Sequence, residues 1–343
     1  MHLDRLKAFL EATAGPGYEV SELQPLSGGY SNETFAFQAH HKGKDHHMIL
    51  RKQMESGGIL QTDLAAEFRA IECLHRRGFP VCKVHWLDAT GEFLGQPGFV
   101  MERVGGTSKP EPLFQPGAEP LLKKVSTEII DALGELHSLE PSELSDTGLA
   151  VPDDWEGYIN AQINEMEAGF DAILLEGLPA VAEMFRWLRR NIPEPLPFRL
   201  VHCDYQMANF MYDDTGLKAI IDWELVHFGD PREDLGWLQI MCLLFGFDIR
   251  PHVEGGFLER YSERSGLPVT PEGVLFFQIL RGLAVTWGVM RNAHGFAVGT
   301  HRDIMAPYLQ IPVQKGTRLQ LESMGMTHER LGQLQEMTKA GVA

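Results

Sequence analysis

The 343-residue sequence is poor in cysteine, in long apolar runs and in positive charge. Its four cysteines form no C-x-x-C pair, which excludes a disulfide framework and a zinc ribbon and favours a reducing cytoplasm. The longest apolar runs, 238–247 and 283–290, are shorter than the roughly 20 residues of a membrane helix, and Arg281 precedes the second. The first residues lack the basic region and apolar block of a secretory signal. We therefore expect neither a membrane span nor export.

Acidic residues outnumber basic ones, 47 to 30, and the excess is unevenly distributed. Residues 1–105 hold 11 Lys and Arg against 13 Asp and Glu, whereas residues 106–343 hold 19 against 34. A surface this acidic repels nucleic acid, so nucleic acid is not expected as a partner. A cationic or neutral small molecule would be tolerated, although solubility alone also explains an acidic surface.

The composition is that of a globular chain, with 44% hydrophobic and 22% charged residues. A single core rarely grows beyond about 250 to 300 residues, so two lobes are expected. Residues 1–105 alternate strand patterns with one helix, and residues 106–343 are mostly helical. The expected fold class is therefore α+β, with a small β-rich N-terminal lobe (1–105), a larger helical C-terminal lobe (106–343) and a hinge at about 99–106.

Local patterns predict the main elements. Strands are expected at 23–26, 34–38 and 46–51, and a polar turn joins the last two into a hairpin. A helix is expected over 62–77, because apolar residues recur at helical spacing and a glycine follows. A second strong helix pattern covers 121–138.

The segment 198–224, FRLVHCDYQMANFMYDDTGLKAIIDWE, carries the clearest chemical signal. Strand patterns at 210–212 and 217–221 flank turn residues and predict a hairpin. This hairpin brings Asn209 and Asp222 side by side at its open end, where an amide oxygen and a carboxylate suit Mg²⁺ that carries phosphate oxygens. Asp204, in the loop before the hairpin, would then lie close to the metal as a base.

Two alternatives also fit this segment. It could be a buried hairpin in which Asp and Asn only cap turns. It could also belong to a zinc hydrolase that uses His202, Asp204 and His227, although a third His or Cys at ligand spacing is missing.

The spacing of His202, Asp204, Asn209 and Asp222 resembles the H-x-D-x-x-x-x-N pattern and the metal-binding Asp of the protein-kinase-like fold. HCD at 202–204, IDWE at 221–224 and GDP at 229–231 resemble the aminoglycoside phosphotransferase and choline kinase branch. LRK at 50–52 and GGIL at 57–60 look most like the phosphotransferase modules associated with acyl-CoA dehydrogenases. Cys203 departs from the usual glycine. The resemblance covers roughly residues 20–305.

This resemblance implies an enzyme that transfers the γ-phosphoryl group of ATP to a hydroxyl of a small molecule. Asp204 would accept the proton of the acceptor hydroxyl, and Asn209 and Asp222 would hold Mg²⁺. Asp230 and Asp234 would hold the catalytic loop by hydrogen bonds to its backbone or to an arginine.

The N-terminal lobe would bind the nucleotide. The loop with Gly28, Gly29, Ser31 and Asn32 resembles the GGxSN loop of this branch, and paired glycines allow backbone N–H groups to approach phosphates. Without the resemblance, a plain hairpin turn accounts for this motif equally well. The hinge run 99–104, which contains Glu102, would offer backbone groups to adenine.

Arg51 occupies the position equivalent to the kinase strand lysine, whereas Lys52 points to the opposite face of the strand by alternation. Glu67 falls within the apolar arc of the helix expected over 62–77. Because a buried carboxylate needs a partner, we expect an ion pair between Glu67 and Arg51. The alternatives are an exposed arginine and a glutamate that reaches solvent. Glu224 could aid metal or acceptor binding, or be a solvated acid at a strand end.

A catalytically inactive nucleotide-binding scaffold and a protein kinase are the alternative functions. A scaffold would have no use for the base Asp204, and the seven residues between Asp222 and Asp230 leave no room for a regulated activation segment. The sequence specifies neither the acceptor, nor ATP over GTP, nor the oligomeric state. The acidic C-terminal part would favour a cationic acceptor, but the more specific local motifs favour a hydroxylated metabolite other than an aminoglycoside.

Overall fold

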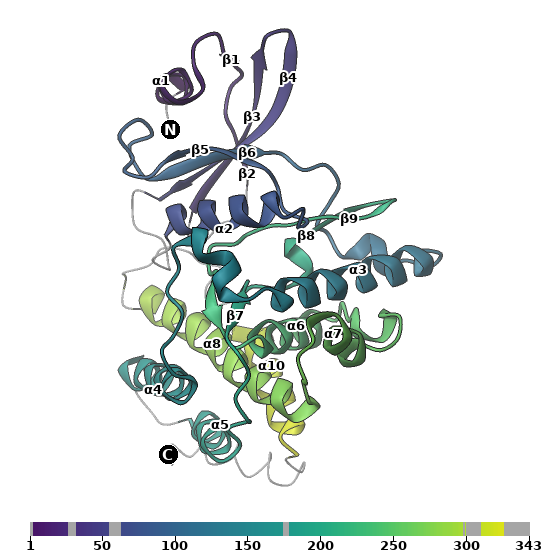
Figure 1. The fold of residues 1–343 in the computed structure, drawn as a ribbon. Helices are drawn as coiled ribbons and strands as arrows, with labels where there is room; N and C mark the ends of the chain where they lie inside the picture. Colours follow the sequence, from purple (N-terminus) through teal and green to yellow (C-terminus); the bar gives the residue numbers. More distant parts are fainter. Residues whose placement is uncertain are drawn as a thin grey trace. The chain divides into compact units, whose positions relative to one another are not determined.

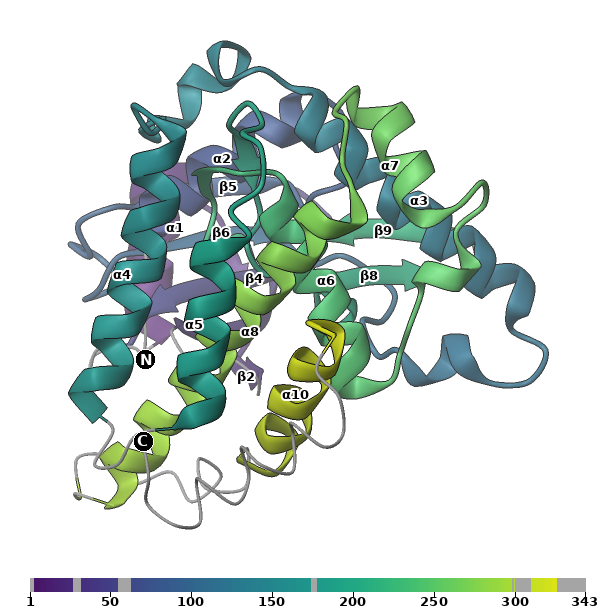
Figure 2. The ribbon, with the colours of Figure 1, turned by 90° about the horizontal axis from the view of Figure 1, so that it is seen from below.

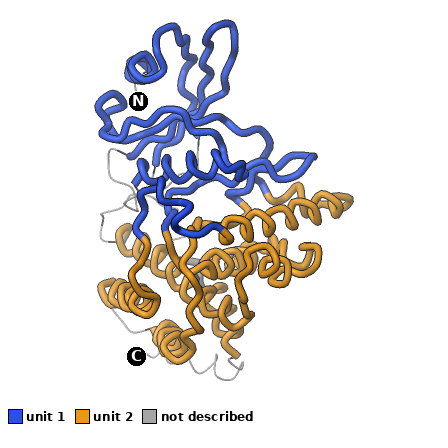
Figure 3. The backbone as a smooth tube through the Cα atoms, in the orientation of Figure 1, with its two compact units in different colours: residues 1–109, 139–150, 208–227 blue, residues 110–138, 151–207, 228–343 orange. Residues whose placement is uncertain are grey.

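The computed structural model describes residues 3–26, 32–54, 63–173, 178–297, 299 and 310–325 (Figure 1). The chain forms two compact units (Figure 3). The first comprises residues 1–109, 139–150 and 208–227, and the second comprises residues 110–138, 151–207 and 228–343.

This grouping differs from the lobe boundary expected near residue 105, because two later segments belong to the first unit. Backbone hydrogen bonds explain one of them. Thr107 and Tyr212 exchange two bonds of 2.9 and 3.0 Å, and the Ile220 N–H donates to the Pro80 carbonyl at 2.7 Å. The hairpin that carries the predicted metal ligands is thereby attached to the N-terminal residues.

The first unit is built on a six-stranded antiparallel sheet. The strands follow the order β1-β3-β4-β6-β5, and β2 also pairs with β3. Their bounds are β1 (Glu19–Val20), β2 (Gln24–Leu26), β3 (Asn32–His41), β4 (Lys44–Gln53), β5 (Val84–Asp88) and β6 (Gly98–Glu102). The three strands expected from the sequence are confirmed. Arg51 lies in an inner strand, opposite Thr34 on β3 and Phe99 on β6.

Side chains that alternate along β4 contact two different helices. Leu50 packs into a buried cluster with Phe9 of α1 (Leu3–Ala14), whereas the next residue, Arg51, contacts Glu67 of α2 (Leu64–Arg76). Helix α2 begins where the Asp63 side chain accepts the backbone N–H groups of Ala65 and Ala66, as an N-cap does. The helix expected over 62–77 is confirmed.

The predicted hairpin is present as β8 (Phe210–Asp213) and β9 (Gly216–Ile220). A short 3₁₀ turn, Met207–Asn209, leads into it. Further 3₁₀ turns lie at Glu111–Phe114, Pro141–Thr147 and Arg250–His252.

The second unit is mainly helical. Its helices are α3 (Glu119–Ser138), α4 (Trp155–Ile173), α5 (Pro179–Arg190), α6 (Arg232–Phe245), α7 (Phe257–Ser265), α8 (Pro271–Ala297) and α10 (Gln310–Ser323). A small sheet pairs β7 (Arg199–Val201) with β10 (His227–Gly229). Side chains of α4, α5 and α8 form one buried cluster, and Figure 2 shows these three helices side by side.

By length and apolar composition, α8 could cross a membrane over Pro271–Phe296, which the short apolar runs of the sequence did not suggest. More than half of its most apolar window is buried in the protein. Phe276, Phe277 and Leu283 are fully buried against neighbouring helices, so we interpret α8 as a core helix. The architecture confirms the expected α+β class, with an antiparallel N-terminal sheet and a helical C-terminal part.

Candidate active site

Arg51 lies at the centre of an ion cluster in the first unit. Its Nε is 3.2 Å from Glu67 Oε2, and its Nη2 is 2.6 Å from both Asp222 Oδ1 and Glu224 Oε2. The Asn32 amide donates to the same Glu224 oxygen at 2.8 Å. The expected pair with Glu67 is confirmed, and the other two carboxylates are additional. The roles of these residues in nucleotide binding stay predictions.

Burial sets the protonation of this cluster. The Glu67 side chain is only 2% exposed. Burial raises the pKa of Glu67 to about 8 against the opposing effect of Arg51, and the negative charges of Asp222 and Glu224 raise it further. For Arg51, burial acts to lower the pKa, but the three carboxylates outweigh burial and raise it above its ordinary value. The guanidinium therefore stays charged.

Asn209 and Asp222 both lie at the open end of the hairpin, where the backbone of Asn209 pairs with Ile221, the residue before Asp222. The Ile221 N–H donates to the Asn209 carbonyl at 2.9 Å, which fixes this end of the ladder. Asp222 has a left-handed backbone, with φ 68°, a conformation that costs a side-chain-bearing residue about 1 to 2 kcal/mol. Its carboxylate is a third exposed and is held by Arg51.

The donor set of this hairpin fits Mg²⁺. Asp222 and Glu224 each place an oxygen on one positively charged nitrogen, so their carboxylates already converge on a cation. Asn209 lies at the same open end of the hairpin, and carboxylate and amide oxygens are the hard ligands that Mg²⁺ prefers. Asn209 and Asp222 remain the residues predicted to hold the ion.

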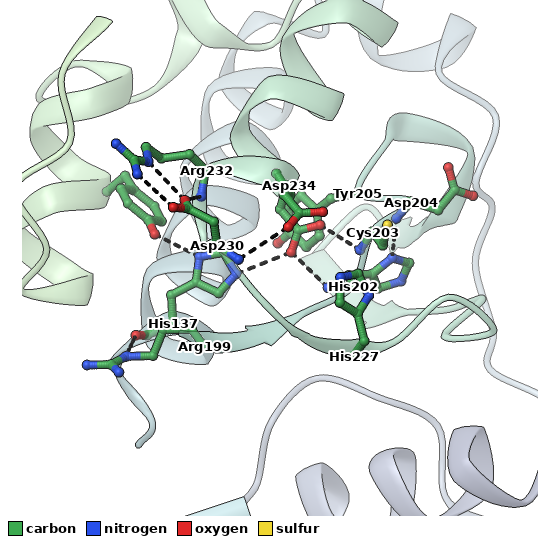
Figure 4. A network of polar contacts seen from close by, with 12 residues as sticks. His137, Arg199, His202, Cys203, Asp204, Tyr205, His227, Asp230, Arg232 and Asp234 are labelled. Atoms are coloured by element: carbon green, nitrogen blue, oxygen red, sulfur yellow. Dashed lines mark hydrogen bonds and ion pairs between the residues drawn. The ribbon is translucent and has the colours of Figure 1, made fainter. Parts of the chain in front are cut away.

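The predicted catalytic loop follows β7 in the second unit. The Asp234 carboxylate, at the start of α6, accepts the backbone N–H groups of His202 at 2.8 Å and Cys203 at 2.7 Å (Figure 4). Cys203 has φ 67°, the left-handed conformation for which glycine is the usual residue. The loop therefore keeps a glycine-like backbone although Cys203 replaces the usual glycine, and the hydrogen bonds that its N–H groups donate to Asp234 hold it.

Asp204 is ordered by its own loop. Its N–H donates to His202 Nδ1 at 3.1 Å, and Gln206 Nε2 donates to Asp204 Oδ1 at 2.6 Å. Because the backbone of Asp204 uses the Nδ1 lone pair of His202, that nitrogen is not open to a zinc ion. The zinc hydrolase interpretation therefore loses one of its ligand atoms.

Asp230 and Asp234, which the sequence predicted to hold the loop, have different partners. Asp234 holds the loop backbone, whereas Asp230 binds the Arg232 guanidinium through both carboxylate oxygens, at 2.9 and 2.6 Å, and accepts Trp155 Nε1 at 2.7 Å. Asp230 thus fixes the beginning of α6, the helix that presents Asp234 to the loop.

Sequence reasoning missed a buried histidine behind the loop. His137 Nε2 lies 3.2 Å from Asp234 Oδ2, and its Nδ1 lies 2.7 Å from the Tyr261 hydroxyl (Figure 4 shows His137 beside Asp234). Because a carboxylate only accepts, His137 Nε2 donates to Asp234. The signal available in the sequence was a histidine among the apolar positions of α3.

A cavity of about 280 Å³ adjoins the catalytic loop in the second unit. It is lined by Gln162, Glu165, Met166, Leu280, Arg281, Ala284 and Trp287. Arg281 Nη2 donates to the Cys203 carbonyl at 3.2 Å and contacts its sulfur at 2.7 Å, which connects the cavity wall to the residue before Asp204. Burial raises the pKa of the Cys203 thiol to about 12. No sequence motif indicated Arg281.

The remaining predicted nucleotide-binding residues are partly described. Gly28, Gly29 and Ser31, like the GGIL motif at 57–60, lie outside the described residues. The Glu102 N–H donates to the Lys83 carbonyl at 2.8 Å, and the role of Glu102 toward adenine stays a prediction.

Lys52 is buried, 3.2 Å from the carboxylate of Glu33. It is separate from the Arg51 cluster, as strand alternation predicts.

Comparison with known proteins supports the motif resemblance. A model of the phosphotransferase enzyme family matches residues 22–273. Human acyl-CoA dehydrogenase family member 11 is 28% identical over 288 residues, which are 82% of this chain and 34% of the relative. The chain thus spans about a quarter to a third of the length of the curated relatives it matches.

Solved structures agree on the fold. A Ralstonia eutropha protein that is considered an aminoglycoside phosphotransferase has a TM-score of 0.73 and 19% identity, covering 94% of this chain and 98% of its own. A thermostable mutant of aminoglycoside phosphotransferase APH(4)-Ia, in ternary complex with AMP-PNP and hygromycin B, has a TM-score of 0.60 and 19% identity over 91% and 97% of the two chains. The motifs, the fold and the matched span agree, and the chain belongs to the phosphotransferase enzyme family.

Proposed function

We propose that this protein is an Mg-ATP-dependent phosphotransferase that phosphorylates a hydroxyl of a small-molecule acceptor. The observation that carries the proposal is the ion cluster of the first unit, where Asp222 and Glu224 converge on Arg51 and Glu67 supports the same guanidinium. A cation for phosphates beside oxygen ligands for a metal is what nucleotide-dependent phosphoryl transfer requires. The AMP-PNP complex of a protein with this fold supports a nucleotide in the same role.

The roles follow from the chemistry of the groups. Asp204 accepts the proton of the acceptor hydroxyl while that oxygen forms a bond to the γ-phosphorus, and the bond to the bridging oxygen breaks to release ADP. Arg51 binds the α- and β-phosphates, and Glu67 orients Arg51. Mg²⁺, when bound at Asn209 and Asp222, neutralises charge on the phosphates.

The cavity beside the catalytic loop supports an acceptor other than an aminoglycoside. Its lining contains one carboxylate, Glu165, and one guanidinium, Arg281, and the other residues are mostly apolar. A polycationic sugar would require several carboxylates. A hydroxylated metabolite with an apolar or acyl portion matches Trp287, Met166 and Leu280 better, and we propose this class as the acceptor.

All four cysteines are free and buried. This supports the proposal of a reducing cytoplasm, because buried thiols gain nothing from an oxidising compartment.

A phosphorylation screen tests the function. The purified protein is incubated with ATP, Mg²⁺ and a library of hydroxylated metabolites that includes a kanamycin-type antibiotic, and ADP and phosphorylated product are measured together. We expect equal amounts of both with at least one metabolite and no product with Asp222→Ala. No product with any acceptor, together with no binding of Mg-ATP in calorimetry, would leave the inactive scaffold as the better description.

A further inference from the structure

We propose that Arg51 is an internal counter-ion that holds Asp222, the carboxylate proposed to bind the metal, and its neighbour Glu224 until Mg²⁺ and nucleotide arrive together, so that the protein excludes the metal alone. The inference rests on the proposed function, because it concerns the same carboxylates. Metal and nucleotide then bind with strong mutual dependence, and Arg51 is the residue that causes this dependence.

Two carboxylates contact one nitrogen of Arg51. Arg51 Nη2 is 2.6 Å from Asp222 Oδ1 and 2.6 Å from Glu224 Oε2, so a positive charge already occupies the point on which both carboxylates converge. Mg²⁺ binds oxygen at about 2.0 to 2.1 Å. An ion that used these oxygens from the same side would lie within a few ångströms of the guanidinium, where like charges repel strongly. Metal binding therefore requires Nη2 to leave Asp222.

The contacts of Arg51 are divided so that Nη2 can leave without releasing the whole side chain. Nε faces Glu67 on α2, whereas Nη2 faces the two carboxylates of the IDWE motif. Glu224 in turn keeps a second donor, the Asn32 amide at 2.8 Å. When Nη2 moves away, Nε keeps its contact with Glu67, which has ion-pair distance but no hydrogen-bond geometry, and Asn32 still donates to Glu224.

The freed Nη2 needs an anion, since the side chain is 10% exposed and a buried charge without a partner is costly. A nucleotide phosphate supplies that anion, and the metal alone does not. When the metal binds without nucleotide, the protein thus loses the Arg51 contacts with the carboxylates and Nη2 gains no new anion. When metal and nucleotide bind together, the ion pairs of Arg51 with the carboxylates are replaced by ion pairs with the phosphates. By linkage, each ligand must strengthen the binding of the other by the same factor.

The test is the affinity for metal in the absence of nucleotide. Mn²⁺ replaces Mg²⁺ as a paramagnetic probe, and the loss of the free Mn²⁺ signal in electron paramagnetic resonance reports binding. We expect Arg51→Gln to bind Mn²⁺ alone at least about fivefold more tightly than the parent protein, the lower end of typical coupling. The same substitution should weaken binding of ATP, and the opposite change in Mn²⁺ affinity separates this mechanism from general damage to the site, which would weaken both.

Arg76→Gln is the matched control. Arg76 lies on the same helix as Glu67 and pairs with Asp146 at the surface, so its loss removes the same charge from the same unit. At 0.3 M KCl, long-range effects of exposed charge are largely screened, and this control should bind Mn²⁺ like the parent. The double variant Arg51→Gln with Glu67→Gln keeps a neutral pair of similar volume. It should show the same gain in Mn²⁺ affinity if the single variant does not fold.

Two failures are distinguishable. If the parent protein binds Mg-ATP and the folded Arg51 variants bind Mn²⁺ no better than the parent, the counter-ion role is wrong and the proposed function stands. If the parent protein binds no Mg-ATP, the proposed function fails, and the Mn²⁺ comparison still decides whether Arg51 competes with a metal for Asp222 and Glu224.

Discussion

Asp204 combines a fixed backbone with a side chain oriented by one neighbour. His202 holds its N–H, and Gln206 donates to one carboxylate oxygen. A carboxylate that is positioned in this way is suited to accept a proton from a bound hydroxyl.

We expect Asp204→Asn to lower kcat by about 10² to 10⁴, the usual contribution of general-base catalysis, without changing the affinity for Mg-ATP. The amide keeps the shape of the side chain and removes only the proton acceptor. Turnover of the identified acceptor and calorimetric titration with Mg-ATP measure the two quantities. A variant that turns over at the parent rate would show that another group is the base.

The cysteines give a second prediction for single residues. Burial raises the pKa of the thiols of Cys82, Cys203 and Cys242 to about 12, and Cys73 is buried as well. Since the thiolate is the reactive form, a thiol reagent at pH 8 should label none of them in the native protein and all four in urea. Rapid native labelling of Cys203 would contradict the packing of Arg281 against its sulfur.

At the scale of elements, α6 is the support of the catalytic loop. Asp234 accepts two loop N–H groups through two different oxygens, and His137 of α3 donates to one of these oxygens. The loop geometry therefore depends on how two helices present their side chains.

Asp234→Asn should lower kcat more than it raises KM for the acceptor. An amide has one accepting oxygen, so one buried loop N–H loses its partner, at a cost of about 1 to 3 kcal/mol. Glu135→Gln, an exposed change on α3, serves as the control. Steady-state kinetics with the identified acceptor measure both constants, and a change in KM alone would argue against a positioning role.

The elements that could be predicted from the sequence are those that depend on residues close together in the chain. Hairpins and helices depend on neighbouring residues, so the pattern of 62–77 and the turn at 213–216 were sufficient, and the hairpin placed Asn209 beside Asp222. The pair of Arg51 with Glu67 could also be predicted, because helix periodicity put a carboxylate on a buried face.

The missed contacts join residues far apart in the chain. Arg281 is 78 positions from Cys203, and His137 is 97 positions from Asp234. No local period encodes such contacts, since they depend on how whole helices pack. Glu224 was left open for the same reason: its contacts with Arg51 and Asn32 require a register between the hairpin and the sheet.

At the scale of the whole molecule, the protonation of Glu67 makes the free energy of unfolding depend on pH. Its folded pKa of about 8 exceeds the ordinary value of 4.5, so the folded state holds the proton more tightly than the unfolded state. The stabilisation from this group is therefore complete below about pH 4.5 and is lost as the pH rises through 8.

Urea unfolding with EDTA at about pH 5 and about pH 8.5 tests this dependence. The parent protein should lose stability relative to Glu67→Gln between these values, because the amide cannot ionise. Equal pH dependence of the two proteins would mean that Arg51 keeps Glu67 ionised throughout the range.

The first unit also has a consequence for biosynthesis, because it is not contiguous in the chain. Its sheet is complete at Glu102, but the hairpin with Asp222 leaves the ribosome only after residues 110–138 and 151–207 of the second unit have been made. At about 5 to 20 residues per second, the delay is roughly 5 to 25 s. During this interval Arg51 can have Glu67 but neither of its other two carboxylates. The nascent N-terminal sheet must therefore wait for a later part of the polypeptide, and a ribosome that stalls before residue 222 displays the sheet with Arg51 but without the carboxylates of Asp222 and Glu224.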